Sequence, residues 1–582
     1  MTNAAVAKVM REIAALLDME GVPFKPRAYE KVAYTIDALD EPLADSYAKG
    51  GLKALGEIPG VGRGIGEKIE ELLTTGKLKY YDDLHAKVPA DISELTAIEG
   101  IGPKHVKALY DALRIRTVDD LERAARAGQI RTLSHFGEKS EQKILKGIEF
   151  LRGHTGRQPL GTVLPLLEDI QARLGTIAGV QQVAIAGSVR RRRETVGDGD
   201  VLVVSNQPER VMEFFIGMRE VTRVLGQGST KSSVRLETGL QVDLRVVPSK
   251  SFGAALNYFT GSKAHNVTLR KIAIERGLKL NEYGVFRGEK QIAGKTEEDV
   301  YDILGLPYIE PELREDAGEI DAAREGRLPR LIQYGEVRGD LQTQTTWTDG
   351  ANSIEEMVKE ARRLGREYMA ITDHTKSLAM MGADEAKLRE QIKAIRALRK
   401  HLKGFTLLSG AEVNINKDGT LDIDDDVLAE LDVVGVAVHS HFNLPRAEMT
   451  RRIIRAMESP HADILFHPTG RVINKREAYD VDIDAIIAAA KRTGTILEID
   501  AFPERLDLKD EHVRKAIAAG VKLVIDSDAH SVNHLAYIDY GIATARRGWA
   551  EKKDVVNTLP VDKFLASLKN GRRAAKSTAR KR

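Results

Sequence analysis

Apolar positions in the first 150 residues recur every three to four residues, which is the spacing of amphipathic helices. The first such stretch, residues 1–17, carries its apolar side chains on one helical face. Charged residues interrupt this face, so it predicts a folded helix and not a secretory signal.

A glycine turn followed by a helix occurs repeatedly in this region. Residues 58–73 read IPGVGRGIGEKIEELL, residues 98–111 read IEGIGPKHVKALYD, and a weaker version at 133–148 reads LSHFGEKSEQKILKGI. A glycine turn that opens a helix leaves backbone N–H groups free to hold a phosphate. One such turn is equally typical of an ordinary helix connection. Its repetition favours binding to a nucleic-acid backbone without sequence-specific contacts to the bases. The glycines expected to contact this backbone are Gly60, Gly62, Gly100 and Gly102.

Strand-like alternation begins at residues 183–204, VAIAGSVRRRRETVGDGDVLVV. Asp198 and Asp200 lie two apart at the start of a strand, so both carboxylates point to one face. A third carboxylate, Asp243, lies in the later strand LQVDLRVV. Converging carboxylates repel one another unless cations lie between them, so the pattern predicts two Mg²⁺ or Mn²⁺ ions and in-line phosphoryl transfer. The candidates for binding a triphosphate are Ser188, Arg191 and the backbone of the glycine turn.

The second half of the chain alternates short apolar runs with helical segments. YMAITDH, TLLSGAEVNI, LDVVGVAVHS, ADILFHPTG, GTILEIDA and VKLVIDSDAH each predict a buried strand. This alternation predicts a (β/α) barrel, in which chemistry gathers at the C-terminal ends of the strands. The side chains with metal-ligand chemistry at those ends are His374, Glu412, His439, His467, Asp528 and His530.

Composition narrows the class of protein. A length of 582 residues predicts about four domains, and 42% hydrophobic with 30% charged residues indicates a folded globular chain. The absence of cysteine excludes disulfides and thiolate metal sites and favours a reducing cytoplasm. The net charge is only +2, so a polyanion must be met by local patches. No apolar run is long enough to predict a membrane span.

The carboxylate motifs resemble those of X-family DNA polymerases, of which polymerase beta is the familiar member. GSVRRRRETVGDGD is similar to their nucleotidyltransferase signature, QVDLRVV to the strand with their third metal ligand, and residues 255–286 to their nucleotide-binding region. The resemblance implies that Asp198, Asp200 and Asp243 hold the metals and that Asp243 helps to deprotonate the primer 3′-hydroxyl. The implied dNTP pocket consists of Ser188, Arg191, Gly197, Tyr258, Phe259, Gly261 and Asn266, and Arg270 would contact the template.

The front segments resemble helix-hairpin-helix motifs, and FKPRAYEKVAYTID with the first hairpin is similar to the small lyase-type domain of the same polymerases. Lys68 occupies the family position of the Schiff-base lysine that removes a 5′-deoxyribose phosphate, with Lys25 and Tyr29 nearby. Lys68 fits a solvated helix surface equally well, so lyase activity stays open.

The last region resembles the polymerase and histidinol phosphatase (PHP) domain, a barrel that gathers metals for phosphoester hydrolysis. Its first strand ordinarily ends in DLHxHTxxSDG, whereas this chain reads DLQTQTTWTDG; it keeps Asp349 and carries Gln342 and Gln344. An amide oxygen is a poor replacement for imidazole, so we expect reduced occupancy by Mn²⁺ or Zn²⁺. A weakened Mn²⁺-dependent 3′–5′ exonuclease, a nuclease with fewer metals, and a barrel kept for shape and DNA contact stay open.

Together these motifs are identified as those of PolX, the bacterial branch of the X family. The expected units are a lyase-like domain with the first hairpin (1–85), a helix-hairpin-helix fingers-type region (86–152), a nucleotidyltransferase palm (153–250), a nucleotide-binding thumb-type domain (251–316), a linker (317–335), a PHP barrel (336–568) and a basic tail (569–582). The tail would add salt-sensitive DNA affinity or be a solvated end.

The expected function is a cytoplasmic, monomeric repair polymerase that uses dNTPs to fill short gaps in gapped or primer-template DNA, as in base excision repair, without a membrane partner. The alternative is a non-catalytic scaffold that binds DNA ends. The intact carboxylate triad favours the enzyme. A free-standing small-molecule phosphatase fits the barrel alone and leaves the front half unexplained.

Overall fold

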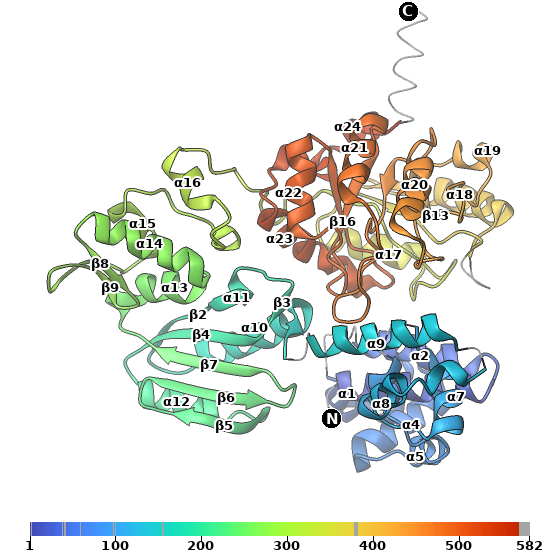
Figure 1. The fold of residues 1–582 in the computed structure, drawn as a ribbon, viewed down its shortest axis with the longest axis horizontal. Helices are drawn as coiled ribbons and strands as arrows, with labels where there is room; N and C mark the ends of the chain where they lie inside the picture. Colours follow the sequence, from blue (N-terminus) through green and yellow to red (C-terminus); the bar gives the residue numbers. More distant parts are fainter. Residues whose placement is uncertain are drawn as a thin grey trace, which may run out of the picture.

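The computed structural model describes residues 1–569 apart from positions 2, 38, 40, 41, 59, 97, 99, 135, 154, 155 and 378–381. Residues 570–582, which are nearly all of the expected basic tail, lie outside the described residues. An N-terminal bundle of helices, a mixed palm and thumb, and a C-terminal barrel follow one another along the chain (Figure 1).

The N-terminal part is helical and has one hydrophobic core. Its helices are α1 (Asn3–Met19), α2 (Lys25–Asp37), α3 (Leu43–Gly56), α4 (Arg63–Thr75), α5 (Lys79–His85), α6 (Ile92–Thr96), α7 (Pro103–Leu113), α8 (Val118–Arg126) and α9 (Glu138–Gly153). A single buried cluster extends from Val6 to Ile148, so the segments 1–85 and 86–152 share their core. The expected hairpin turns have the same backbone form, since Gly60 has φ 85° and Gly100 has φ 89°. Both values lie in the region that glycine adopts at little steric cost.

The palm is a five-stranded sheet in the order β2-β4-β7-β6-β5. Its elements are β1 (Gln158–Pro159), α10 (Leu160–Gly175), β2 (Val180–Ile185), α11 (Gly187–Arg190), β3 (Thr195–Val196), β4 (Asp198–Ser205), α12 (Pro208–Ile216), β5 (Val221–Gln227), β6 (Lys231–Leu236) and β7 (Gln241–Val246). β4 and β7 are parallel, and the other neighbouring pairs of this sheet are antiparallel. The alternation of buried and exposed residues in β6 and β7 matches a sheet with one covered face.

The thumb continues directly from the palm. It contains α13 (Phe252–Thr260), α14 (Lys263–Glu275), β8 (Lys279–Asn281), β9 (Gly284–Arg287), β10 (Lys290–Ala293), α15 (Glu297–Ile303) and α16 (Glu319–Arg324). α16 lies inside the segment that was expected to be a linker. Ile320 and Ala323 of this helix belong to the thumb core together with Leu331, so the segment is a packed connection and not free chain.

The C-terminal half has seven parallel strands in sequence order, as the alternating pattern predicts. The strands are β11 (Gly339–Asp340), β12 (Tyr368–Ile371), β13 (Thr406–Asn414), β14 (Val433–Ala437), β15 (Ile464–Leu465), β16 (Ile496–Asp500) and β17 (Leu523–Asp526). The helices are α17 (Ile354–Arg363), α18 (Glu385–Arg399), α19 (Asp425–Leu428), α20 (Arg446–Met457), α21 (Ile483–Thr493), α22 (Asp510–Ala519), α23 (Ile538–Arg547) and α24 (Val561–Ser567).

The first and last strands of the barrel meet through backbone hydrogen bonds just beyond their ends. The amide of Gln344 donates to the carbonyl of Ala529 at 2.8 Å, and the amide of Ala529 donates to the carbonyl of Gln342 at 3.2 Å. This contact places the two glutamines beside Asp528 and His530, which follow the last strand.

Side chains of the barrel contact the palm and thumb. Arg547 of α23 donates to the backbone oxygen of Arg191 at 2.9 Å and pairs with Glu315 at 3.1 Å. A Cβ atom on Gly161 of α10 would lie only 2.2 Å from Cβ of Pro503, so glycine permits close palm–barrel packing here.

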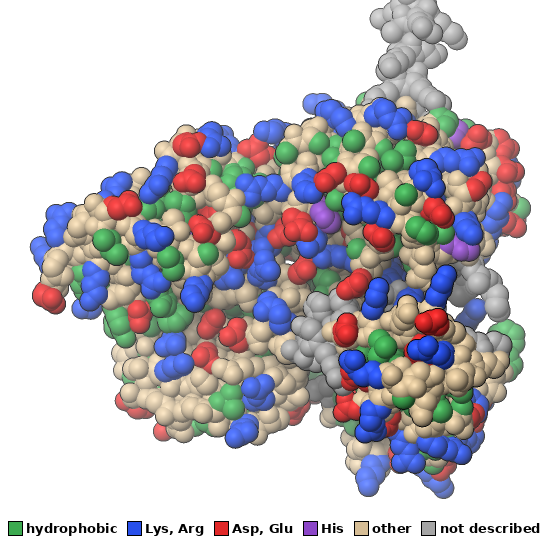
Figure 2. Space-filling model, viewed as in Figure 1, with side chains coloured by type: hydrophobic (Ala, Val, Ile, Leu, Met, Phe, Trp, Pro, Cys, Tyr) green, Lys and Arg blue, Asp and Glu red, His purple; other side chains and the backbone are tan. Residues whose placement is uncertain are grey.

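Over the face shown in Figure 2, acidic and basic side chains are interspersed. In the described ranges, every helix is too short or too polar to cross a bilayer.

Candidate functional site

The palm carboxylates come together because of strand register. Asp200 of β4 is paired with Asp243 of β7, and Asp198 lies two residues before Asp200 on the same face. Burial, and then repulsion from Asp198 and Asp243, raises the pKa of Asp200 to about 7. A buried carboxyl group that is repelled by two other carboxylates would bind a cation strongly.

Three neighbours hold Asp243 in its ionised form. Burial opposes ionisation, but hydrogen bonds from Gln241, Ser233 and Lys231 bring the pKa of Asp243 below its usual value. The amide of Gln241 lies 3.0 Å from Asp243 Oδ1, and the ammonium of Lys231 lies 3.2 Å from Oδ2. Lys231 thus supplies the positive charge at this carboxylate.

The glycine turn approaches the carboxylates closely. Gly187 has φ 65°, and a Cβ atom there would lie 2.4 Å from Asp200 Oδ2. Ser188 follows in α11. Gly197 and Asp198 line a cavity of about 510 Å³ together with Gln158, Arg235 and Gln241. The turn therefore lies against Asp200, and Asp198 faces an open cavity.

The expected dNTP-pocket residues of the thumb lie together at the turn between α13 and α14. The side-chain amide of Asn266 donates to the carbonyl oxygens of Tyr258, at 2.7 Å, and Gly261, at 3.1 Å. Tyr258 and Phe259 are in edge contact with ring centroids 5.1 Å apart. Arg270 lies one helical turn beyond Asn266 on α14.

Arg191 is not directed to an open pocket. Its guanidinium donates to the carbonyl of Thr260 at 2.7 Å and to Glu315 at 3.0 Å. It therefore joins the palm to the thumb, and a contact with a triphosphate would require it to exchange partners.

Lys68 lies beside the ring of Tyr80. Its ammonium is 4.7 Å from the ring centroid of Tyr80 and donates to the carbonyl of Gly64 at 2.9 Å. Tyr80 stacks on Tyr29 with ring centroids 6.4 Å apart, so Tyr29, one of the two expected neighbours, lies one ring away from Lys68. Lyase activity stays a prediction.

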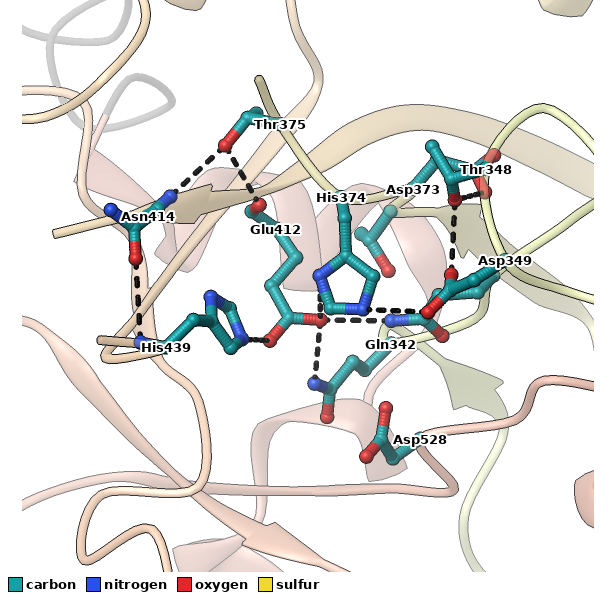
Figure 3. A network of polar contacts seen from close by, with 12 residues as sticks. Gln342, Thr348, Asp349, Asp373, His374, Thr375, Glu412, Asn414, His439 and Asp528 are labelled. Carbon is teal, nitrogen blue, oxygen red and sulfur yellow. Dashed lines mark hydrogen bonds and ion pairs between the residues drawn. The ribbon is translucent and has the colours of Figure 1, made fainter. Parts of the chain in front are cut away.

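At the barrel mouth, Glu412 accepts from a ring of side chains (Figure 3). The amides of Gln342 and Gln344 donate to Oε2 at 3.1 and 2.8 Å. The Nε2 atoms of His439 and His467 lie 2.9 and 2.7 Å from Oε1. Burial opposes ionisation of Glu412, but the neighbouring histidines hold its pKa well below the usual value.

A second group of possible ligands adjoins the first. Asp349 Oδ2 lies 3.5 Å from His374 Nε2 and 3.6 Å from His530 Nε2. Asp349–His374–His530 and His374–Glu412–His439 are the groups in the described chain whose ligand atoms lie within 4.8 Å of one another. His374 therefore belongs to both groups, whereas the palm carboxylates are spaced more widely.

Further carboxylates inside the barrel escaped the sequence analysis. Glu498 and Asp500 end strand β16, and Asp526 ends strand β17. Burial, followed by repulsion from nearby carboxylates, raises the pKa of each well above its usual value. Arg505 Nε lies 3.4 Å from both Asp500 and Asp528. The polar residues in ILEID at a strand end were the signal that could have revealed Glu498 and Asp500.

Comparisons with known proteins agree with this layout. Family models match at residues 1–78 (helix-hairpin-helix domain), 92–149 (SAM-like helix-hairpin-helix tandem), 255–315 (DNA polymerase beta thumb) and 340–467 (PHP domain). DNA polymerase/3′-5′ exonuclease PolX of Bacillus subtilis (strain 168) is 37% identical over 582 residues, covering 98% of this chain and 100% of that protein.

Two other relatives each match only part of the chain. DNA polymerase lambda of Rattus norvegicus is 26% identical over 343 residues, covering 54% of this chain and 56% of its own. A protein named probable phosphatase, from Thermoanaerobacter sp. (strain X514), is 29% identical over 245 residues, which are 40% of this chain and 95% of that one. With the full-length match, these similarities show that the chain belongs to the PolX family of DNA polymerases, with helix-hairpin-helix modules at its front and a PHP domain at its end.

Proposed function

We propose that this polymerase fills short gaps in DNA by two-metal nucleotidyl transfer from a dNTP to a primer 3′-hydroxyl. The observation that carries the proposal is the pairing of Asp200 with Asp243 across β4 and β7, with the pKa of Asp200 raised to about 7. Mg²⁺ or Mn²⁺ held by Asp198, Asp200 and Asp243 would stabilise the charge that develops during phosphoryl transfer.

Side chains and backbone groups of the chain would accept the primer proton, bind the triphosphate and select against a 2′-hydroxyl. Hydrogen bonds keep Asp243 ionised, which is the form that can accept the primer proton, but by lowering its pKa they also weaken it as a base. A bound metal ion that lowers the pKa of the 3′-hydroxyl would offset this weakness. The turn containing Gly187 and Ser188 leaves backbone N–H groups for the triphosphate. Tyr258 and Gly261, held by Asn266, form the wall expected to exclude a 2′-hydroxyl.

A gapped duplex with a 5′-labelled primer tests this proposal. Asp200→Ala should abolish extension while leaving DNA binding largely intact, because the hairpin modules lie elsewhere in the chain. Glu209→Ala, which removes an exposed carboxylate from α12, is the matched control, and this variant should extend the primer normally. Extension by Asp200→Ala would refute the assignment.

For the barrel we propose a weakened metal-dependent 3′–5′ exonuclease. Its support is the set of buried oxygens without a hydrogen-bond partner among the described residues, which includes Gln342 Oε1, Gln344 Oε1 and Asp528 Oδ1. Such atoms are costly unless a cation or another partner satisfies them. Together with the clustered histidines, this donor set fits Mn²⁺ or Zn²⁺, held by the groups Asp349–His374–His530 and His374–Glu412–His439.

Primer shortening with Mn²⁺ and without nucleotides separates the two centres. We expect shortening to persist in Asp198→Ala and to disappear in His374→Ala, since His374 belongs to both ligand groups. A primer that stays intact with the wild type would mean that the barrel serves shape and DNA contact. A scaffold without either activity would neither extend nor shorten the primer. The cytoplasmic location and the monomeric state stay predictions.

A further inference from the structure

A cavity of about 580 Å³ lies between the N-terminal helices and the barrel mouth. Its barrel wall includes Asp349, Arg505, Asp528 and His530, and its opposite wall is one face of α2. Figure 1 shows the N-terminal helices below the barrel. The candidate metal site is therefore not bounded by the barrel alone. The residues of α2 that line the cavity are Arg27, Glu30, Lys31 and Thr35.

The sequence of α2 explains why it presents charge to the barrel. Tyr29, Val32 and Ile36 are buried in the N-terminal core and lie on one helical face. Arg27 and Lys31 are four residues apart on another face, and both are exposed. The helix is thus anchored through one side, and Arg27 and Lys31 lie on the other.

The charges around the cavity suit a phosphodiester chain. Of the acidic groups in its wall, Asp349 and Asp528 belong to the candidate ligand set, and Glu504 is paired with Lys475 at 2.7 Å. Glu30 lies near Arg27, which partly offsets the effect of burial on the pKa of Glu30. Arg27 and Lys31 line one wall of the cavity, and Arg505, which also lies 3.4 Å from Asp500 and Asp528, lines the other. Basic side chains in such positions bind phosphate oxygens.

The first hairpin turn lies directly behind this face of α2. A Cβ atom on Gly60 would lie 3.7 Å from Cγ of Lys31 and 3.5 Å from Cγ2 of Val32. The turn that is expected to hold a DNA backbone and the cation at the cavity are therefore neighbours. A strand held at Gly60 and Gly62 would meet the cavity at Lys31, which lines the same cavity as Asp349.

We propose that this cavity is a cleft for one DNA strand with a free 3′ end, and that Arg27 and Lys31 of the N-terminal domain hold its phosphates opposite Arg505. Pockets of roughly 300–1,000 Å³ hold single small ligands, so the cleft takes one or two nucleotides and not a duplex. The chemistry done there rests on the proposed barrel nuclease. The binding of the strand does not.

Photochemical cross-linking in EDTA tests strand binding without requiring activity. The probe is a single-stranded oligonucleotide with a 3′-terminal 4-thiothymidine, and cross-linked peptides are identified by mass spectrometry. We expect cross-links to the cavity residues Phe502 or His534. In Arg27→Glu with Lys31→Glu they should fall about tenfold, and the salt slope of oligonucleotide binding should decrease by about 1.4, or about 0.7 per lost contact.

The matched control is Lys77→Glu with Lys79→Glu, which makes the same charge change at exposed positions of the same domain. It should keep the cross-links, and thermal unfolding of both variants verifies that they are folded. Cross-links that map elsewhere, or that fall equally in the control, overturn the proposal. Cross-links in the cleft without shortening of the strand in Mn²⁺ support the cleft and refute the nuclease.

Discussion

At the scale of single residues, Gln342 and Gln344 have an unusual place in the barrel. Both direct an amide N–H group to the same oxygen of Glu412, where the related domain ordinarily has two imidazoles. Their own carbonyl oxygens are buried without a partner in the described chain. An unsatisfied buried polar group costs about 1–3 kcal/mol, so this arrangement satisfies the ionised Glu412 with hydrogen bonds at the expense of two carbonyl groups.

Restoring the imidazoles should restore metal binding. We predict that Gln342→His with Gln344→His raises the affinity for Mn²⁺ and the rate of primer shortening at least about tenfold, because imidazole is a better ligand than an amide. Calorimetric titration with Mn²⁺ and the shortening assay measure the two effects. The same pair in a His374→Ala background is the control and should gain far less. Unchanged affinity would contradict the prediction.

Gly187 provides a second test at this scale. A methyl group there would collide with Asp200 and strain a residue with φ 65°, so Gly187→Ala should lower primer extension at least about tenfold. Gly226→Ala in β5 is the matched control, because a Cβ atom there meets no neighbour within 4 Å among the described residues. Steady-state extension kinetics compare the two. Equal rates would show that the turn does not position Asp200.

At the scale of elements, α15 is tied to the palm and to the chain that leads to the barrel by one buried carboxylate. Glu297 accepts from Arg190 of α11 at 2.6 and 2.9 Å and also pairs with the buried Arg314. Burial raises the pKa of Glu297, but the two guanidinium groups outweigh it and hold that pKa at about 2. The folded state therefore favours the ionised carboxylate more than the unfolded state does.

This linkage predicts a pH-dependent stability. A depressed folded pKa contributes stability above the ordinary pKa of glutamate, and the contribution is lost as pH falls from about 4.5 to about 2. Glu297→Gln should therefore lower the urea midpoint clearly at pH 7, and the difference from wild type should shrink below pH 4.5. Glu298→Gln, exposed on the same helix, should have little effect at either pH. A pH-independent difference would contradict this account.

The spacing of apolar residues predicted many helices and strands, but not which of them pack into a core. The hairpin glycines, the palm strands and the alternating strands and helices of the barrel follow local patterns, so they could be predicted from the sequence alone. The polar segment 317–335 has the composition of a linker, yet α16 inserts Ile320 and Ala323 into the thumb core. Its two apolar contacts are too few to mark a helix in the sequence, and the partner surface alone makes it favourable.

At the scale of the whole molecule, the barrel is joined to the polymerase half. Arg547 contacts the backbone of Arg191, Glu315 of the thumb and Asp510 of the barrel. Arg546 pairs with Glu312 at 2.7 Å. Because Arg191 also contacts Glu315, one group of ion pairs connects palm, thumb and barrel.

Removal of Arg547 should loosen this junction. We predict faster amide hydrogen exchange at residues 187–193 and 312–315 in Arg547→Ala, since buried charges lose their partner there. Exchange measured by mass spectrometry tests this directly. Arg492→Ala removes an exposed pair with Glu458 on the barrel and should leave both segments unchanged. Equal exchange in the two variants would mean that the junction is held by other contacts.

The sequence by itself determined the order of the modules, the shared face of Asp198 and Asp200, the hairpin turns and the two glutamines, because each depends on neighbours within a few residues. Only the tertiary structure decided that both glutamines bind Glu412, that Arg191 is paired with the thumb, and that α2 faces the barrel. These contacts join residues far apart in the chain, and no local period encodes which distant surface a side chain will meet.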